Sequence, residues 1–200
     1  MNQKTSSVVK FILLAAVLGF ALKQWVIEPF TVPTGSMQPT IQIGQTVFVS
    51  KLFKNPYKRR DIVAFNFPNP AGERFVKRIT ALPNDSVYTN NGLYSTTQPA
   101  THALDYAAHK IPQKRDTVHL NSQNLSFYRP LITHYENTSL NALTTGQIFI
   151  NNQEINIYTF HQNYYFLQGD NTQNSTDSRN WGPVPENLIF GKTLFVHSSE

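Results

Sequence analysis

The chain of 200 residues contains no cysteine. This absence excludes disulfide bonds, thiolate metal sites and a cysteine nucleophile, so any nucleophile here must be an oxygen or an amine. Charged residues are also scarce, at 14% of the chain, compared with roughly 25% in an average soluble domain. Hydrophobic residues make up 40% and aromatic residues 12%. That composition excludes intrinsic disorder and predicts one or two folded domains with a substantial core.

The scarce charges are unequally divided, with 17 Lys and Arg against 12 Asp and Glu, which leaves a formal net charge of +5. An excess of basic residues favours binding either to a nucleic acid or to an anionic membrane surface, and composition alone does not distinguish these two partners. Part of the excess lies in residues 51–60. We interpret this stretch as a solvated hairpin loop or, alternatively, as a patch that contacts anionic lipid.

Residues 11–22 form an apolar run of twelve residues without a polar side chain. Twelve helical residues rise only about 18 Å, which is short of the roughly 30 Å hydrocarbon core of a bilayer. A helix over residues 8–27 has twenty residues, and it is long enough if Lys10 and Lys23 extend to opposite interfaces. Trp25 then falls where an interfacial aromatic residue is expected.

This N-terminal segment is compatible with a membrane anchor, a cleaved signal peptide or a buried core helix. Gly19, Phe20 and Ala21 offer only a weak cleavage site. A buried core helix is the least favoured of the three, because the segment is uniformly apolar and is preceded by lysines. Lys4 and Lys10 favour an N-terminus inside the cell, which places the residues after about 28 outside.

The rest of the chain predicts a mainly β domain, because short β-branched or aromatic runs alternate with Gly, Pro, Asn and Asp. The expected strands are residues 47–49, 61–67, 74–80, 147–151, 154–159, 164–167 and 192–196. Residues 67–72 and 151–153 are expected to form hairpin turns. Residues 88–145 are rich in polar residues with weak periodicity, so we interpret them as an insertion on the β core, with a short helix within residues 120–135.

The first segment that suggests chemistry is Pro33-Thr-Gly-Ser-Met-Gln-Pro-Thr40. Its two prolines exclude a helix and hold Ser36 on a rigid loop. Gly35 allows close approach of the backbone, and the Ser36 amide and the Thr34 hydroxyl are donors near one point. The segment is therefore either a nucleophile with its oxyanion hole or simply a proline-bordered turn.

A serine nucleophile needs a base. The six histidines are scattered and show no metal-ligand spacing, so no metal is expected. Lysine serves as a base when burial keeps it neutral. In residues 74–80, strand alternation places Lys77 on one face between Phe75 and Ile79. The alternative is an ordinary lysine on an edge strand.

Residues 169–182 gather Asp, Asn, Ser and Arg between two glycines, directly after an apolar run. The sharper interpretation is a polar network built on an ion pair of Asp177 and Arg179, with the Ser175 hydroxyl available to an amine. A calcium loop that uses Asp170, Asn174 and Asp177 as oxygen ligands is the alternative, although the spacing and terminal glutamate of an EF-hand are missing.

Together these segments resemble the bacterial type I signal peptidases, which are membrane-bound serine proteases with a Ser/Lys dyad. The similar segments are residues 28–40, 44–52, 60–65, 75–85, 169–185 and 191–192, about half of the chain in the family's order. The resemblance implies that Ser36 is the nucleophile and Lys77 the general base. It implies that Thr34 and the Ser36 amide stabilise the oxyanion. It also implies that the Ser175 hydroxyl holds the lysine amine and that Asp177 and Arg179 form a supporting pair.

The resemblance also implies a coiled, antiparallel β-sheet catalytic domain over residues 28–200, preceded by a transmembrane anchor and a short cytoplasmic tail in residues 1–27. It favours the retained anchor, and with it a single-pass protein of the plasma membrane that acts as a monomer. The expected partners are preprotein signal peptides and the lipid bilayer, without nucleic acid or cofactor. The implied substrate-binding residues are Phe30, Val32, Pro33, Met37, Phe75 and Val76, in strands that flank an extended signal peptide cut after small residues.

Three residues depart from the family's pattern: Gln45 replaces a usual Asp, Ala81 a usual Gly, and Asn84 a common Gly. These changes bear on turn geometry and not on the proposed dyad. Two alternatives remain. Self-cleaving Ser/Lys repressors share the fold but carry a DNA-binding domain where this chain has an apolar segment. The other alternative is a membrane-tethered β domain that binds a protein partner without catalysis.

Overall fold

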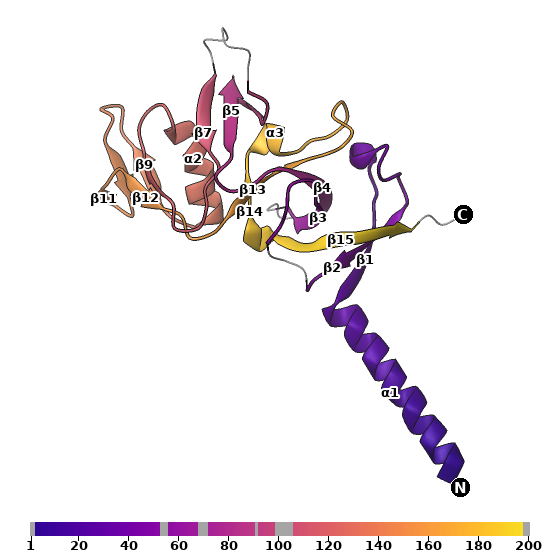
Figure 1. Ribbon diagram of the computed structural model, residues 1–200. Helices are drawn as coiled ribbons and strands as arrows, with labels where there is room; N and C mark the ends of the chain where they lie inside the picture. The colour runs from indigo at the N-terminus through magenta and orange to yellow at the C-terminus, as the bar shows by residue number, and fades with distance from the viewer. Residues whose placement is uncertain (1–2, 53–55, 68–71, 91, 99–105, 198–200) are drawn as a thin grey trace.

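The computed structural model describes residues 3–52, 56–67, 72–90, 92–98 and 106–197. A long helix, α1 (Gln3–Trp25), extends away from a β-rich body (Figure 1). The helix ends before the predicted Ile27, because Ile27 already pairs with Ser50 in a sheet. The side chains of Lys4, Lys23 and Trp25, which were expected at the membrane interfaces, lie outside the described part of the chain.

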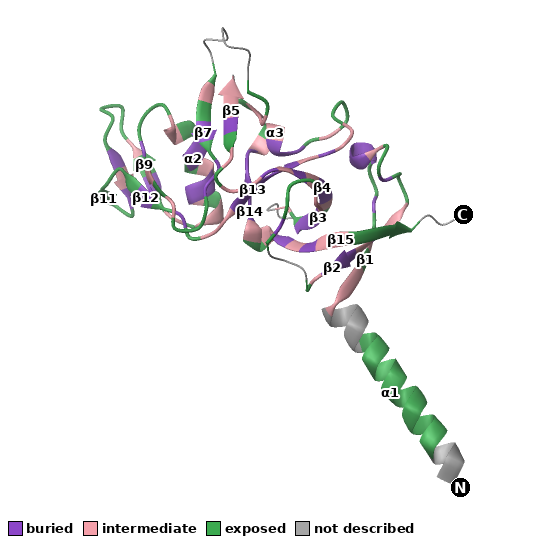
Figure 2. Ribbon diagram, viewed as in Figure 1, coloured by how far each residue is buried: buried purple, intermediate pink, exposed green. Residues whose placement is uncertain are grey.

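Apolar side chains on α1 are exposed along residues 8–20, as Figure 2 shows, and Phe11 is 75% exposed. Within the described residues, no helix combines the length and the apolar character that crossing a membrane requires.

The β body contains one seven-stranded antiparallel sheet in the order β1-β2-β15-β3-β4-β13-β14. Its strands are β1 (Ile27–Thr31), β2 (Thr46–Ser50), β3 (Ile62–Asn66), β4 (Arg74–Ala81), β13 (Tyr164–Gln168), β14 (Val184–Pro185) and β15 (Ile189–His197). Glu28 of β1 forms an ion pair with Arg74 of β4, although three strands separate β1 from β4 in the sheet. The sheet must therefore curl until these two strands face each other. The predicted mainly β fold with a coiled antiparallel sheet is confirmed.

The curled sheet has cores on both faces. Its inner face buries Val32, Met37 and Val76, and its outer face buries Phe65 and Leu167. The backbones of the paired strands β15 and β2 approach each other closely, because a Cβ on Gly191 would lie 2.3 Å from the carbonyl oxygen of Ser50. Only glycine fits such a close approach of two backbones without a shift.

A second unit with its own core lies between β4 and β13 in the sequence. Its elements are β5 (Ser86–Asn90), β6 (Leu93–Ser95), β7 (Ala107–Lys110), β8 (Thr117–His119), α2 (Leu125–Pro130), η2 (Leu131–Tyr135), β9 (Leu140–Ala142), β10 (Ile148–Ile150), β11 (Gln153–Glu154) and β12 (Ile157–Thr159). The strands of this unit form three small sheets. β10 pairs with β9 and β12 pairs with β8, so neither β10 nor β12 belongs to the large sheet. The short helix expected within residues 120–135 is confirmed as α2 and η2.

One of the two expected hairpin turns lies within the described residues. Asn151 and Asn152 have φ values of 50° and 65° and form the tight turn between β10 and β11, as predicted. Most of the expected turn at 67–72 lies outside the described residues, as do residues 53–55 of the basic run. Three further short helices are η1 (Gly35–Met37) after β1, η3 (Glu186–Leu188), which leads into β15, and α3 (Ser178–Trp181), which belongs to the polar segment described below.

Candidate active site

Ser36 lies in a single turn of 3₁₀-helix, η1 (Gly35–Met37), that follows β1. The expectation that this segment contains no helix is wrong by this one turn, which fits between the two prolines. Two backbone bonds hold the approach to this turn, from Val32 N to Gln45 O and from Gly44 N to Val32 O, each 2.9 Å. Met37, which follows Ser36, is fully buried and anchors the turn in the inner core. The serine is consequently fixed by its neighbours on both sides, and it is only 7% exposed.

Lys77 reaches this serine from the middle of β4. Its Nζ donates a hydrogen bond of 2.5 Å to Ser36 Oγ, although 41 residues separate the two in the chain. The lysine is only 2% exposed, and its ammonium lies 5.6 Å from the centre of the Phe75 ring. The structure thus brings together the serine and the lysine that the sequence singled out separately.

Burial lowers the pKa of Lys77 to about 8, because the charged ammonium is removed from water. The charge of Asp177 acts in the opposite direction and that of Arg179 in the same direction, but burial dominates. A substantial fraction of the lysine is therefore neutral near pH 8, and a neutral amine next to a hydroxyl is able to accept its proton.

Asp177 is the centre of the supporting network and is completely buried. Its carboxylate accepts two bonds from the Arg179 guanidinium, both 2.9 Å, and one of 2.9 Å from the Gly169 amide. Burial alone would raise the pKa of Asp177, but the bonds from Arg179, Gly169 and Ser175 outweigh it and lower the pKa. The expected ion pair of Asp177 and Arg179 is present, and Asp177 also caps the N-terminus of α3.

The Ser175 hydroxyl donates to Asp177 Oδ2 at 2.8 Å. This hydroxyl and the Ser36 turn both lie against Gly169. A Cβ on Gly169 would lie 2.2 Å from Ser175 Oγ and 2.4 Å from the carbonyl oxygen of Ser36. The absence of a side chain at this glycine is what allows the polar segment to pack against the Ser36 turn.

Asn171 and Asp170 fix the polar segment to its surroundings, Asn171 through the Ser36 turn and Asp170 through β4. Asn171 donates its backbone N–H to Ser36 O and its side-chain amide to Gly35 O, both at 3.0 Å. Asp170 accepts bonds of 2.7 and 2.5 Å from Arg78, which follows Lys77 on β4. Their position directly after the apolar run of β13 was the available sequence signal, but nothing in the sequence shows which backbone atoms Asn171 contacts.

Thr34 is exposed, and its hydroxyl donates to Ser36 Oγ at 3.4 Å. Among the residues implied for substrate binding, Val32, Met37 and Val76 are buried together on the inner face, with Phe30 packed against them. Phe75 lies on the other face of β4 beside Phe67 and Trp181. Pro33 is exposed next to Thr34.

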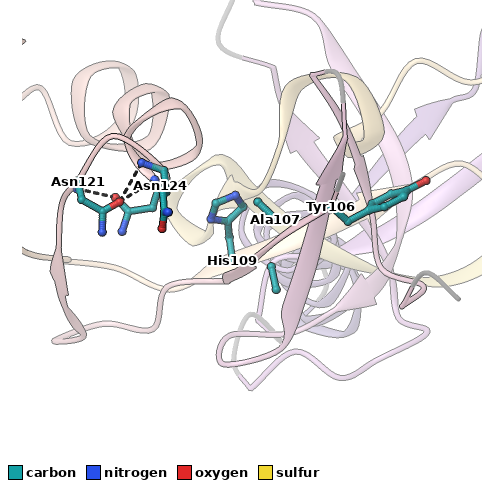
Figure 3. A pocket seen from close by; sticks show the side chains of 7 residues that line it. Tyr106, Ala107, His109, Asn121 and Asn124 are labelled. Atoms are coloured by element: carbon teal, nitrogen blue, oxygen red, sulfur yellow. Dashed lines mark hydrogen bonds between the residues drawn. The ribbon is translucent and has the colours of Figure 1, made fainter. Parts of the chain in front are cut away.

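A cavity of about 620 Å³ lies elsewhere, in the second unit between β7 and the loop before α2 (Figure 3). His109 in its wall stacks on Phe127, and burial lowers the pKa of this histidine. The side chains of Asn121 and Asn124 bond mainly to the backbone of their own loop. Across the described ranges no group of three or more His, Asp or Glu side chains is arranged to hold a metal ion.

The chemistry open to a buried serine hydroxyl beside a lysine of lowered pKa is nucleophilic acyl transfer, the reaction of serine hydrolases that use lysine as base. A sequence model of the family described as signal peptidase, peptidase S26, matches residues 5–198. The chain therefore belongs to the peptidase S26 family of signal peptidases, and it is a serine endopeptidase.

Individual relatives agree with this assignment. A signal peptidase I of Aquifex aeolicus (strain VF5) is 27% identical over 212 residues, which cover 94% of this chain and 82% of that protein. A signal peptidase I of Rickettsia typhi is 29% identical over 237 residues, which cover 98% of this chain and 82% of the relative. Among solved structures, a signal peptidase I from Enterococcus faecalis V583 is 23% identical and covers 69% of this chain and 97% of its own, with a TM-score of 0.31.

Proposed function

We propose that this chain removes N-terminal signal peptides from exported preproteins, cutting after small residues through an acyl-enzyme on Ser36 with Lys77 as the general base. The observation that carries the proposal is the 2.5 Å bond between Lys77 Nζ and Ser36 Oγ, made by a lysine that is 2% exposed. Membership of the signal peptidase family supplies the substrate class.

In the proposed reaction, neutral Lys77 accepts the Ser36 proton while Ser36 Oγ attacks the scissile carbonyl carbon. The oxyanion of the tetrahedral intermediate faces the Ser36 amide and the Thr34 hydroxyl. As the C–N bond breaks, the Lys77 ammonium returns the proton to the leaving amine. Water then attacks the ester carbonyl while Lys77 takes its proton. As the C–Oγ bond breaks and the acid product leaves, the Lys77 ammonium returns that proton to Ser36 Oγ, which restores the hydroxyl and the neutral amine.

The supporting residues act through position. Asp177 holds Arg179, Ser175 and the Gly169 amide, and Gly169 lies against the carbonyl of Ser36. We assign Ser175, Asp177 and Arg179 to keeping the polar segment packed on the Ser36 turn. Asp177 and Arg179 also act on the pKa of Lys77, which the charge of Asp177 raises and that of Arg179 lowers.

The sheet supports recognition of an extended substrate by strand addition. β1 is the last strand of the large sheet. Among the described strands, β13 pairs with β4 only at Arg78, Ile79 and Ala81. Residues 74–77 of β4 are therefore paired on one side only, by β3. Backbone groups of β1 and of the first half of β4 are in position to pair with an extended peptide whose scissile bond lies at Ser36.

We further propose that α1 and its flanking residues anchor the protein in the cell membrane, with the N-terminus in the cytoplasm and residues 28–200 outside. The exposed apolar side chains of α1 support this proposal. A second apolar feature lies on β2, the neighbour of β1, and on β15, the neighbour of β2. There Phe48 stacks on Phe195 with ring centres 4.5 Å apart, and Phe195 is 53% exposed. A bilayer is the partner that both surfaces fit.

The experiment that tests the function incubates the full chain, in detergent micelles, with a purified exported preprotein and reads the new N-terminus by mass spectrometry. We expect a single cut that follows a small residue and releases the signal peptide. An intact preprotein at high enzyme concentration would contradict the proposal and favour a domain that binds without cutting.

The pH dependence of the same reaction follows from Lys77. Because only the neutral amine accepts a proton, kcat/KM should fall about tenfold for each pH unit below an apparent pKa of about 8 and level off above it. Initial rates at low substrate concentration between pH 6 and 10 measure this profile. A flat profile from pH 6 to 9 would remove Lys77 from the role of base.

A further inference from the structure

The second unit carries a strand with an open edge. β7 is the last strand of the small sheet β6-β5-β7, and among the described strands it pairs with β5 only. The Tyr128 hydroxyl donates to the carbonyl oxygen of Lys110 at 3.1 Å, so the backbone of Lys110 faces away from β5. Because this direction alternates along an antiparallel strand, the N–H and C=O groups of Ala108 also face away from β5. Both groups of Ala108 are thus open to a further strand.

The cavity of about 620 Å³ lies beside this edge, with residues 106–109 on one side and the loop before α2 on the other (Figure 3). In this view Asn121 and Asn124 lie across from the His109 ring. Gln123 of the same loop also lines the cavity, and its exposed side-chain amide has no hydrogen-bond partner within the described residues. An amide both donates and accepts, as a peptide backbone does, so a strand edge opposite a free amide fits an extended chain.

A smaller cavity of about 330 Å³ adjoins the first at Ala107 and Gln123. Asn90 lines this smaller cavity, and its buried Oδ1 has no hydrogen-bond partner in the described part of the chain. A buried acceptor without a donor is uncommon in folded proteins. The N–H group of a bound chain would supply the missing donor.

The walls of the two cavities are polar but uncharged. None of the described residues that line them is Asp, Glu, Lys or Arg. Burial lowers the pKa of His109, so its ring is neutral at pH 7. Amides, hydroxyls and backbone groups without a charge favour the main chain of a polypeptide over a charged ligand.

The sheet that ends in β7 is joined to the active site through β6. The ring of Tyr94 on β6 would lie 3.6 Å from a Cβ on Gly182, the residue that ends α3. Asp177 caps the other end of the same helix. β7 lies two strand spacings from β6, which is about 10 Å. A chain held at Ser36 that continues past the active site therefore has this edge near its path.

Resting on the proposed function, we propose that the edge of β7 is a second binding site for the preprotein, where the mature part beyond the cut adds to the small sheet as an extended strand. The main chain of the preprotein pairs with Ala108, and Gln123 and Asn90 bond to it from the two cavities. Because these contacts are made to the main chain, the site accepts mature parts of different sequence. It binds substrate and transition state equally, so it lowers KM and leaves kcat unchanged.

The test compares a full preprotein with a truncated substrate that ends shortly after the cut, each incubated with the full chain in detergent micelles. With the wild type we expect KM to be about tenfold lower for the full preprotein, as several added hydrogen bonds allow. Gln123→Ala removes the free amide, and Ala108→Pro removes the outward N–H at an edge strand, where proline is tolerated. Each variant should raise KM for the full preprotein about threefold or more, with kcat unchanged. Both constants for the truncated substrate should stay as in the wild type.

Gln153→Ala is the matched control, because Gln153 is also exposed but lies on β11 in a different small sheet, and its loss should change neither substrate's constants. If Ala108→Pro impairs cleavage of the truncated substrate as well, its fold is disturbed and Gln123→Ala decides. The same KM for the full preprotein in the wild type and in Gln123→Ala would overturn the inference, while cleavage of the truncated substrate still upholds the proposed function. Failure of the wild type to cut either substrate would instead overturn the proposed function.

Discussion

Replacing Lys77 with alanine should lower kcat/KM for preprotein cleavage by about 10⁴-fold or more, as removal of a nucleophile or its base does in other serine proteases. Without the amine, the Ser36 hydroxyl has no base within hydrogen-bond reach among the described residues. Thr34, its other hydrogen-bond partner, donates to Ser36 Oγ and cannot accept a proton at neutral pH. Ser36→Ala should cause a loss of the same size. The double variant should be no worse than either single one, because the two residues act as a unit.

Two variants make this result specific. Lys77→Met keeps most of the side-chain volume in the buried position and should be as inactive as Lys77→Ala, which separates loss of the base from loss of packing. Lys192→Met is the matched control on β15, where the lysine pairs with Asp61 at 2.6 Å, and it should keep nearly full activity. Cleavage by Lys77→Met at more than about a tenth of the wild-type rate would show that another group acts as base.

The large sheet was predictable from the sequence because its strands alternate and are bounded by turn residues. The runs at 47–49, 61–67, 74–80 and 164–167 coincide with its strands to within a residue at each end, and the run at 192–196 lies inside β15, which begins three residues earlier at Ile189. The residue pattern does not indicate β1, since Pro29 interrupts the β-branched pattern and the strand is completed only by pairing with β2. Only the resemblance implies a strand before Ser36. The strands β5 to β8 were missed for a related reason: they are three to five residues long and polar, so tertiary pairing rather than local preference decides them.

The members of the site could be named from motifs, but their contacts could not. The neighbours of Lys77 in the strand predicted a buried lysine, and burial of β4 on both faces produces it. Ser175 was assigned to the lysine amine by resemblance, whereas its hydroxyl bonds to Asp177, two residues away. Asn171 escaped notice because its partners are backbone carbonyls 135 or more residues away in the chain. Residues that position others through backbone atoms leave little trace in composition or spacing.

Lys77→Met should also make the protein more stable at neutral pH, by about 3 kcal/mol in the free energy of unfolding. The pKa of Lys77 is about 8 in the folded protein and near its ordinary value of 10.5 in the unfolded chain. Between these values the unfolded chain binds more protons, so the stability of the wild type rises with pH over that window. Below about pH 8 the folded protein bears the full penalty, which is about 1.4 kcal/mol for each unit that separates the two pKa values. Methionine fills the position without a charge.

Unfolding of the full chain in detergent micelles, followed by tryptophan fluorescence at pH 7 and pH 10, measures this effect. The advantage of Lys77→Met over the wild type should shrink from about 3 kcal/mol at pH 7 to less than about 1 kcal/mol at pH 10, where the unfolded lysine is itself losing its proton. Lys192→Met should gain nothing at either pH, since Lys192 is partly exposed and paired with Asp61. A methionine variant that is less stable than the wild type at pH 7, or that differs from it by the same free energy of unfolding at both pH values, would contradict this prediction. Burial would then not be what lowers the pKa of Lys77. A buried lysine that lowers the stability of the fold is expected at an active site, where function opposes stability. An ordinary residue of the sheet core stabilises the fold.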